Sequence, residues 1–272
     1  MSVPLHAVQH IRRMRGGSQA HLLRASDGAY FVTKFLNNPQ SPRILANEML
    51  ATQLGLWLGL PMPQVAAIEV CDWLIENTPE LRIQLAGNEV PCSSGLQFGS
   101  RYPCDPAHEP MEIFDYLPES LMEKVVRPRC FAQVLVIDKW LANADGRQAI
   151  FTRKRRARNY QVSFIDHGYC LNAGEWTFPD QPLRGVYARN CVYKGVTGWE
   201  SFEPTLTRAE ESDIIDIWRC VARIPAEWYE YDCEGLERVV HAVHERRKNI
   251  RGLIEAFRQS SRNPFPNWRE HP

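Results

Sequence analysis

The amino-acid sequence predicts an α+β fold with two lobes: an N-terminal lobe built on an antiparallel sheet with one helix, and a mainly helical C-terminal lobe. Strand-like segments dominate the first part of the chain, one long helical pattern interrupts them, and apolar residues at helical spacing follow from Leu117 onward. We therefore expect the N-terminal lobe at residues 1–115 and the C-terminal lobe at residues 116–272, within one domain. A cleft between two such lobes is a common place for a ligand to bind.

Three strands are predicted near the start of the chain, at residues 6–14, 20–25 and 29–35. Two turn signals separate them, Gly16-Gly17-Ser18 and Ser26-Asp27-Gly28. Because the intervening turns are short, the three strands should form a small antiparallel meander.

A long helix should follow this meander. Ser41-Pro42 opens a helical pattern that continues to Leu58. Residues 65–75 are strand-like again, whereas residues 76–110 are rich in Pro, Gly, Asn and Ser and contain few periodic apolar positions. We expect an irregular excursion at 76–110, and irregular segments of such length usually have a function.

The C-terminal lobe is expected to contain long helices and one strand. Apolar residues recur at helical spacing in residues 131–142, 208–223 and 234–260, while residues 160–165 alternate as in a strand. The tail after Ser260 is polar and rich in proline, so we expect it to fray.

Composition excludes several classes of protein. Lys plus Arg and Asp plus Glu both number 32, so the net charge is zero and no overall field attracts the chain to nucleic acid or to an anionic membrane. No window of about 18 apolar residues indicates a membrane span, and the first residues lack the pattern of a secretory signal. The eight cysteines are scattered, which is typical of a reducing compartment. We therefore predict a soluble cytoplasmic protein.

Two charged residues lie among apolar neighbours and each needs a partner. Lys34 lies inside the third predicted strand, so its ammonium group requires an anion, for which a phosphate would serve. Glu48 lies on a face of the predicted helix that otherwise carries small or apolar residues, and Lys34 is its obvious cation. The alternatives are a surface lysine on an edge strand and a solvated helix glutamate.

A glycine-containing turn precedes Lys34 and consists of Gly16, Gly17, Ser18 and Gln19. Glycines there would let backbone N–H groups approach the phosphate oxygens of a nucleotide closely. The turn matches neither a P-loop nor a full G-x-G-x-x-G pattern, so an ordinary hairpin turn is the plainer interpretation. Its position upstream of Lys34 favours phosphate binding, and Ser18 would then be a candidate site of autophosphorylation.

The strongest local signal is a set of polar residues in the C-terminal lobe. Asp138 precedes Asn143 by five positions, a spacing that matches a catalytic base followed by a metal-binding amide. Asp166-His167-Gly168 follows a predicted strand and resembles the metal-binding Asp-Phe-Gly element. Asp138 could instead be a plain helix residue, yet it shares a face with apolar residues, where an unpaired carboxylate would be costly. Asp145 is expected to fix the loop through hydrogen bonds, with metal or substrate contact as the alternative.

Together these residues match the parts that phosphoryl transfer from ATP requires. Magnesium ions neutralise phosphate charge, a lysine holds the phosphates and a carboxylate orients the attacking hydroxyl group. We predict Asp138 as the base and Lys34, supported by Glu48, as the phosphate clamp. Asn143 and Asp166 would bind Mg²⁺.

Several longer motifs accompany these residues. They are Asn47-Glu48, residues 54–63 (LGLWLGLPMP), residues 95–103 (GLQFGSRYP), Asp138-x4-Asn143-Ala-Asp145 and Phe164-Ile-Asp-His-Gly168. On these motifs the chain resembles the kinase domain of the HipA toxin family, and more closely the smaller HipA-like kinases that lack its usual N-terminal subdomain. The resemblance covers most of residues 10–230 and implies a two-lobed protein-kinase-like fold.

By that resemblance the protein is an ATP- and Mg²⁺-dependent kinase with the site roles given above, and members of this type act as serine/threonine protein kinases. The resemblance also places the hinge between the lobes, where adenine would bind, at Phe114, Asp115, Tyr116 and Leu117. Some members are toxins neutralised by a DNA-binding antitoxin, so an antitoxin-like protein is a candidate partner besides a protein substrate.

Two other functions fit the same residues. A small-molecule or lipid kinase is one, because the Asp-x4-Asn spacing also occurs in kinase-like enzymes that phosphorylate antibiotics, sugars or inositides. A nucleotide-binding scaffold without activity is the other, although the five filled polar positions favour activity.

Two weaker patterns lie outside these residues. The basic run from Arg153 to Arg158 could form a hairpin tip; it is most simply a solvated turn, and otherwise a patch for nucleic acid or an acidic partner. Cys92, Cys104 and His108 have zinc-ligand side chains, but three ligands at irregular spacing fall short of a paired Cys-x-x-Cys signature.

Overall fold

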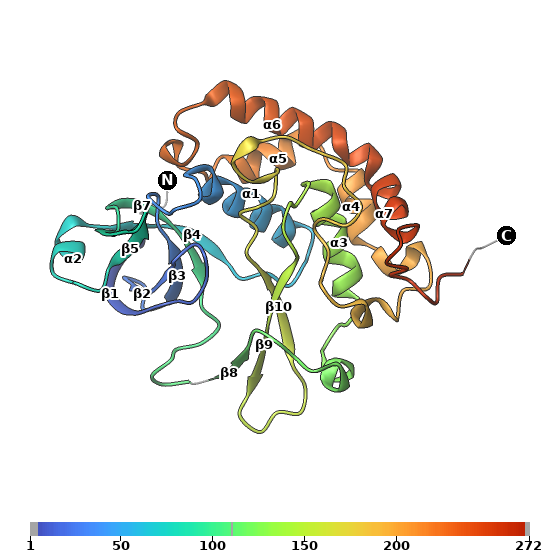
Figure 1. Cartoon of the computed structure of the whole chain (residues 1–272), viewed down its shortest axis with the longest axis horizontal. Coiled ribbons are helices and arrows are strands. Elements are labelled where there is room, and N and C mark those ends of the chain that lie inside the picture. Colours follow the sequence, from blue (N-terminus) through green and yellow to red (C-terminus); the bar gives the residue numbers. More distant parts are fainter. Residues whose placement is uncertain (1–4, 110, 270–272) are drawn as a thin grey trace.

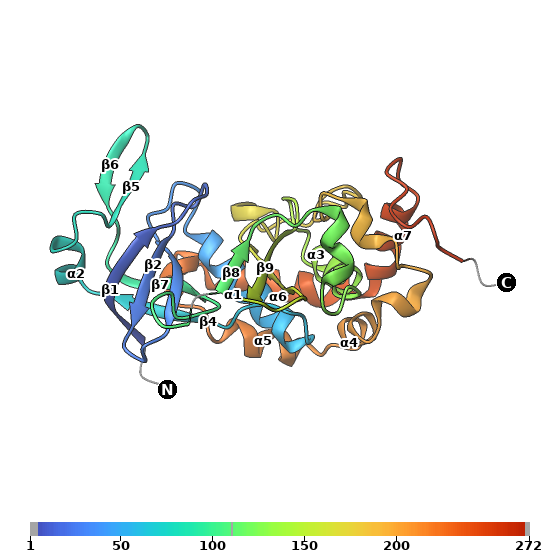
Figure 2. The same ribbon diagram turned by 90° about the horizontal axis from the view of Figure 1, so that it is seen from below.

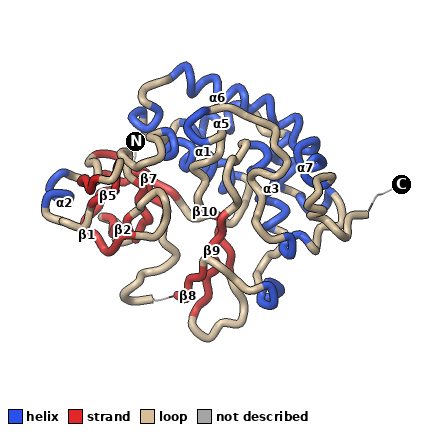
Figure 3. Tube along the Cα trace, in the orientation of Figure 1, coloured by secondary structure: helices blue, strands red, loops and turns tan. Residues whose placement is uncertain are grey.

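Two lobes make up the protein (Figure 1). The computed structural model describes residues 5–109 and 111–269. Strands dominate the N-terminal lobe and helices the C-terminal lobe, as Figure 3 shows. The predicted α+β fold class is therefore confirmed.

Five strands of the N-terminal lobe close into a small barrel, namely β1 (Leu5–Arg13), β2 (His21–Ala25), β3 (Tyr30–Lys34), β4 (Val65–Val70) and β7 (Gly95–Arg101). Their order is β1-β2-β3-β7-β4, and a short parallel pairing of β1 with β4 closes the barrel. The predicted turn at Gly28 joins β2 to β3, and its φ of 81° is a left-handed conformation that glycine adopts without strain. The first three predicted strands are present, but they belong to this barrel rather than to a separate meander.

The irregular excursion expected at 76–110 is wrong, because this stretch contains a small hairpin and a barrel strand. The hairpin consists of β5 (Arg82–Leu85) and β6 (Asn88–Pro91), and Figure 2 shows it projecting from the barrel. Its turn residues Ala86 and Gly87 both have positive φ, at 47° and 85°, as a two-residue hairpin turn requires.

The barrel strand in this stretch is β7, which the sequence pattern concealed. Glycine at positions 95 and 99 weakens the strand signal. Gly99 is nevertheless required, since a Cβ atom on it would lie 2.5 Å from Cγ1 of Ile68 in the neighbouring β4. The strand expected at 65–75 is also shorter than predicted, because helix α2 (Asp72–Glu76) follows β4.

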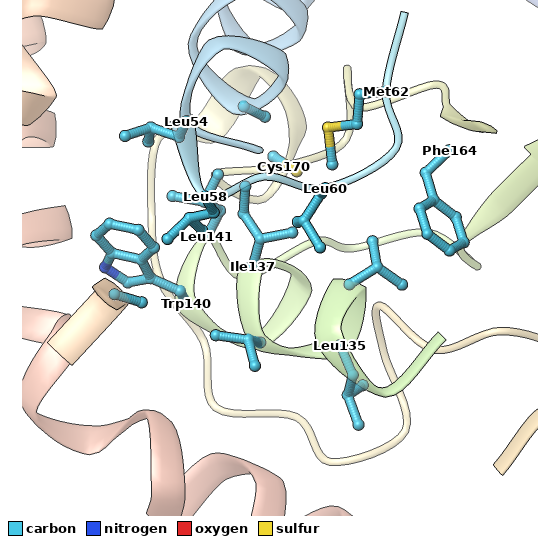
Figure 4. Packing of buried hydrophobic residues seen from close by; sticks show 14 of the residues in the cluster. Leu54, Leu58, Leu60, Met62, Leu135, Ile137, Trp140, Leu141, Phe164 and Cys170 are labelled. Carbon is cyan, nitrogen blue, oxygen red and sulfur yellow. The ribbon is translucent and has the colours of Figure 1, made fainter. Parts of the chain in front are cut away.

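The long predicted helix is α1 (Arg43–Trp57), and eleven of its fifteen residues are buried. Its apolar side chains, among them Leu45 and Leu54, belong to the main hydrophobic core, which they share with the C-terminal lobe. Figure 4 shows Leu54 packed in the same cluster as Ile137 and Trp140. The helix therefore packs tightly against the C-terminal lobe although it follows a strand of the barrel.

The C-terminal lobe is built around α3 (Cys130–Trp140), whose eleven residues are all buried. Beside it lies a three-stranded sheet of β8 (Met111–Phe114), β9 (Gln148–Lys154) and β10 (Gln161–Ile165), in the order β10-β9-β8. Because β8 pairs with β9, it belongs to the C-terminal lobe. A boundary at residue 115 would therefore separate β8 from the sheet to which it belongs, and the boundary stays a prediction.

Two of the long helices predicted in this lobe are each divided. The pattern at 208–223 corresponds to α4 (Thr205–Glu210) and α5 (Ile214–Val221), and Asp213 caps the second of these. The pattern at 234–260 corresponds to α6 (Cys233–Arg246) and α7 (Ile250–Arg258), with a short 3-10 turn between them. The apolar periodicity runs across both breaks because the halves pack against the same core.

Hydrophobic packing, without covalent cross-links, stabilises this fold. All eight cysteines are free thiols, as their scattered spacing predicted. Within residues 5–109 and 111–269, no helix is long and apolar enough to cross a membrane.

Truncation of Trp140 tests the central role of α3. Its ring is fully buried and its indole N–H donates a hydrogen bond of 2.8 Å to the carbonyl oxygen of Val243. We expect Trp140→Ala to lower the free energy of unfolding by about 3–5 kcal/mol, because a large cavity remains. Urea titration followed by circular dichroism measures this change. Trp73→Ala is the matched control, since Trp73 is 68% exposed, and an equal loss there would contradict the assignment.

Candidate active site

A buried lysine lies between two carboxylates where the lobes meet. Lys34 is the last residue of β3, and its side chain is only 10% exposed. Its Nζ donates to Glu48 of α1 and, over 2.8 Å, to Oδ1 of Asp166, which directly follows β10. The structure thus brings together three predicted site residues that lie far apart in the sequence.

The charge of this cluster is unbalanced. Burial alone would lower the pKa of Lys34, but attraction to Glu48 and Asp166 outweighs it, so the pKa lies well above its usual value and the ammonium group stays charged. Burial raises the pKa of Glu48, and Lys34 offsets this effect only in part. Burial also acts to raise the pKa of Asp166, but Lys34 lowers it below its usual value. Asp166 is the more accessible carboxylate, with 34% of its side chain exposed, so negative charge is available there.

The helix α1 also fixes the backbone that carries Asp166. Oε2 of Glu48 accepts a hydrogen bond of 2.9 Å from the backbone N–H of His167. Gly168 lies so close to α1 that a Cβ atom on it would be 2.5 Å from Cγ2 of Ile44. Asp166 itself has a φ of 62°, which is uncommon for a residue other than glycine and has to be held by its surroundings. The glycine of the Asp-His-Gly motif is therefore needed for the helix to come this close.

Asn47, the neighbour of Glu48 on α1, binds the segment that follows Asp166. Nδ2 of Asn47 donates to the carbonyl oxygens of Gly168 and Cys170 at 2.9 Å and of Ala173 at 2.7 Å. Its Oδ1 accepts a hydrogen bond of 2.9 Å from the indole N–H of Trp176. We call this arrangement the Asn47 junction. Asn47 carried no predicted role, although a polar residue on an apolar helix face was the available signal.

Arg43 extends the junction to the other end of the C-terminal lobe. Its guanidinium group lies 4.4 Å from the ring centre of Trp176. The same group pairs with Asp232 at 3.0 Å, and Asp232 caps α6. The segment 168–176 is therefore held by two residues of α1, and Arg43 also ties this helix to the start of α6.

The predicted glycine turn lies near this cluster. Gly16 and Gln19 both have positive φ, at 127° and 51°, so the turn is tight. A Cβ atom on Gly17 would lie 3.9 Å from the side-chain amide of Gln40, which in turn donates a hydrogen bond of 3.1 Å to the hydroxyl group of Tyr169. The turn is thus connected through Gln40 to the segment just after Asp166.

Gln19 has a contact that the sequence did not indicate. Its side-chain amide donates to the carbonyl oxygen of Gln84 at 2.9 Å and accepts from the N–H of the same residue at 2.7 Å. Both ends of the Gln19 side-chain amide are therefore engaged by β5. These two hydrogen bonds connect the end of the glycine turn to the projecting hairpin of β5 and β6.

The predicted hinge residues differ in their access to solvent. Phe114 is half-buried, whereas Asp115 and Tyr116 are exposed, and Arg189 stacks 4.4 Å from the ring centre of Tyr116. Leu117 is only 1% exposed and belongs to the main core. The side chain of Leu117 is thus packed in the core, and the assignment of the hinge to residues 114–117 stays a prediction.

The structure places Asp138 and Asn143 inside the lobe, which argues against their predicted roles as base and metal ligand. Both side chains are only 2% exposed. Arg147 forms an ion pair with the Asp138 carboxylate, and its Nε donates a hydrogen bond of 2.9 Å to Oδ2. Nδ2 of Asn143 donates to Oδ1 of Asp138 over 2.9 Å, and Oδ1 of Asn143 accepts from the N–H of Asp145 over 3.1 Å. A substrate hydroxyl group or a metal ion would therefore have to compete with these contacts.

Segment 179–185 covers these two residues. Gly185 packs so tightly that a Cβ atom on it would lie 3.1 Å from the Cβ atoms of both Asp138 and Asn143. Lys139 fastens the segment by donating to the carbonyl oxygens of Pro182 and Arg184, each at 2.7 Å. The pocket beside Asp138 has a volume of about 60 Å³, which is too small for a nucleotide.

Asp145 is the exposed carboxylate of the same loop. The preceding residue, Ala144, donates its N–H to the carbonyl oxygen of Tyr169 over 2.9 Å. Arg147, two residues later, donates from Nη1 to the carbonyl oxygen of Ile165 over 2.8 Å. The loop around Asp145 therefore lies against the backbone on both sides of Asp166. The local hydrogen bond expected of Asp145 is present as well, since its Oδ1 accepts from the N–H of Gly146 over 2.7 Å.

The weak zinc pattern finds no support. Cys92 is buried, and His108 pairs with Asp105 over 3.0 Å at the surface. Across the described ranges, no group of three or more His, Cys, Asp or Glu side chains is placed to hold a metal ion.

Substitution of Asn47 tests the junction. Asn47→Asp has the same shape but loses both amide donors and directs a buried carboxylate at three carbonyl oxygens, so we expect the free energy of unfolding to fall by about 3–5 kcal/mol. Amide hydrogen exchange should accelerate most in residues 168–176. Asn190→Asp is the control, because its partner Arg262 would stay paired. Unchanged exchange in 168–176 would show that the junction does not hold this segment.

Comparisons with known proteins agree with this arrangement. A kinase from Helicobacter pylori, described as the proinflammatory kinase CtkA, superposes with a TM-score of 0.55 over 92% of this chain and 95% of that one, at 14% sequence identity. The Golgi casein kinase superposes with a TM-score of 0.54 over 95% of this chain and 72% of that one, at 11% identity. A structure of the Golgi casein kinase with Mn/ADP bound gives a TM-score of 0.52 at 11% identity, over 95% of this chain and 73% of that one.

At these identities the structural matches establish the fold alone, which is that of a protein kinase. No curated protein matches the sequence. A family model described as HipA-like kinase matches residues 7–257, which is most of the chain. The resemblance inferred from the motifs is thereby confirmed, and the chain belongs to the HipA-like kinase family.

Proposed function

We propose that this protein is an ATP- and Mg²⁺-dependent kinase that transfers the γ-phosphoryl group to a serine or threonine hydroxyl group of a protein. The observation that carries the proposal is the Lys34 ammonium group held between Glu48 and Asp166, in a chain of the HipA-like kinase family. Positioning and electrostatic stabilisation account for most of the catalysis in such enzymes.

Lys34 and the glycine turn are proposed to bind the phosphates. The pKa of Lys34 lies well above its usual value, so the side chain offers a permanent positive charge to phosphate oxygens. Glu48 is 3% exposed and stays behind Lys34, where it orients the ammonium group. The tight turn at Gly16 and Gly17 would bring backbone N–H groups close to the phosphates.

Asp166 is proposed to hold the divalent metal ion. Its carboxylate is partly exposed, and the cluster of one lysine and two carboxylates favours a further cation, so the residues present fit such an ion. Magnesium prefers oxygen ligands of this kind and would neutralise phosphate charge. The structure of the Golgi casein kinase, which has a similar fold, was solved with Mn/ADP bound. This supports a divalent metal ion with a nucleotide here. Asn143 is left out of this proposal because both ends of its amide are engaged.

Asp145 is proposed to orient the substrate hydroxyl group, in place of Asp138. Asp145 is exposed, and its loop contacts the backbone on both sides of Asp166. A carboxylate at this position could accept the proton of an attacking hydroxyl group. Asp138 instead neutralises the buried Arg147 and so keeps the loop in place.

The adenine ring is proposed to lie against β9 and β10 near the hinge. One face of these strands packs into the core through Phe151 and Phe164, whereas the opposite face carries the half-buried side chains of Ile150 and Ile165. Ile165 immediately precedes Asp166. An apolar surface next to the metal-binding carboxylate suits a flat aromatic base.

A comparison of aspartate variants tests these roles. We expect Asp145→Asn and Asp166→Asn to reduce Mg²⁺-dependent ATP turnover and self-phosphorylation by about 10²–10⁴-fold, because a base or a charge-stabilising group is lost. Asp138→Asn should instead lower the free energy of unfolding by about 3–5 kcal/mol, since it leaves the buried Arg147 charge uncompensated. ATP turnover measured at low temperature, and expressed per folded protein, separates a loss of activity from a loss of stability.

Asp27→Asn is the matched control, because Asp27 lies in the exposed turn between β2 and β3. An inactive but fully stable Asp138→Asn together with an active Asp145→Asn would return the role of base to Asp138. Tight ATP binding without turnover in the wild-type protein would favour a nucleotide-binding scaffold. Phosphorylation of sugars, antibiotics or lipids, but of no protein, would favour the small-molecule kinase.

A further inference from the structure

A basic surface forms where two separate segments of the C-terminal lobe meet. One segment is the stretch between β8 and α3, and the other is the tip of the hairpin of β9 and β10, which projects at the lower edge of Figure 1. In the sequence, only the run in the hairpin stands out as a basic patch. The exposed cations of the two segments, here called the basic surface, are Lys124, Arg127, Arg129, Lys154, Arg155, Arg156 and Arg158.

Backbone hydrogen bonds fix the two segments side by side. The N–H of Tyr160 donates to the carbonyl oxygen of Lys124 over 3.0 Å, and the N–H of Val126 donates to the carbonyl oxygen of Tyr160 over 2.8 Å. Arg158 lies two residues before Tyr160 and Arg127 one residue after Val126. The positive charges of both segments are therefore neighbours in space, although about thirty positions separate them in the chain.

Nothing in the described part of the chain neutralises this charge by an ion pair with these seven side chains. Arg153 at the base of the hairpin is different, because it pairs with Glu112 at 2.6 Å and lies 4.8 Å from the ring centre of Tyr160. Nearby Glu119 is paired with Lys194. Since the protein has no net charge, the excess of cations here is a local feature and not part of a general positive field.

Two of these arginines occupy backbone positions that disfavour them. Arg127 and Arg156 have φ values of 58° and 74°. Glycine or asparagine adopts this left-handed conformation more readily than arginine. Residues that break a local rule in this way are concentrated at functional sites. Local backbone preference therefore does not account for arginine at these two positions.

We propose that the basic surface docks an acidic segment of a protein, and, resting on the proposed function, that this segment belongs to the protein substrate. An extended acidic stretch would complement the two converging segments. A nucleic-acid strand fits less well, because strands bound without sequence preference also stack on free aromatic faces: Tyr160 is 4% exposed, and the exposed Tyr116 already stacks on Arg189. The surface adjoins β8 and the hinge, so a docked substrate would keep its hydroxyl group at high effective concentration near Asp166.

The test measures binding of a fluorescein-labelled glutamate-rich peptide of about 16 residues to the full chain by fluorescence anisotropy at about 0.15 M salt. One variant combines K154S, R155S, R156N and R158S, and another combines K124S, R127N and R129S. Asparagine replaces the two arginines with positive φ so that the turns are kept. We expect each variant to bind at least about tenfold more weakly and their combination to abolish binding.

The matched control removes three exposed cations elsewhere, R24S, R223S and R269S, and should bind the peptide like the wild type. An equal loss in the control, or wild-type affinity in the hairpin variant, would overturn the proposal. Tighter binding of a single-stranded DNA of about 20 nucleotides than of the peptide would overturn it in favour of nucleic acid. Since this assay needs no turnover, an inactive wild type that still binds the peptide would refute the proposed function while leaving the docking surface in place.

Discussion

The arrangement of the site depends on one ammonium group, that of Lys34, held between Glu48 and Asp166. A charged lysine that is only 10% exposed would be costly without anionic partners. Lys34 comes from the barrel, Glu48 from α1 and Asp166 from the end of β10, so the cluster forms only when all three elements are in place. Folding of the two lobes and formation of the site are thereby coupled.

The helix α1 can hold Glu48 beside Lys34 because it contacts both the site and the core of the C-terminal lobe. Its polar side chains Glu48 and Asn47 point to Lys34 and to the segment after Asp166. Its apolar side chains, such as Leu45 and Leu54, are fully buried in the core shared with the C-terminal lobe. Moving α1 away from β3 would uncover several such side chains, each worth about 1.5–3 kcal/mol. We infer that the pair of Lys34 and Glu48 is assembled in the resting protein and is not formed by a swing of this helix.

Sequence patterns predicted the parts of the fold and site that rest on local rules. Lys34 and Glu48 were recognisable because each is a charge among apolar neighbours, and Asp166 because a strand and a glycine flank it. The strand β7 was missed, since Gly99 is required by close packing against Ile68, a contact between distant segments. The roles given to Asp138 and Asn143 rested on their spacing and on the cost of an unpaired carboxylate on an apolar helix face. Neither signal reveals that Asp138 is paired with Arg147, nine residues later in the chain.

The buried pair of Asp138 and Arg147 gives Asp138 a structural role behind the proposed site. Arg147 binds Asp138 of α3 and also donates to the carbonyl oxygen of Ile165, the residue before Asp166. One guanidinium group therefore joins the central helix to the strand that carries the proposed metal ligand. Asp145 lies two residues from Arg147 on the same loop, so this bond also sets the position of the proposed base relative to Asp166. A fully buried ion pair adds little net stability over apolar packing, but its directional hydrogen bonds specify one geometry, which is what a site built from separate elements requires.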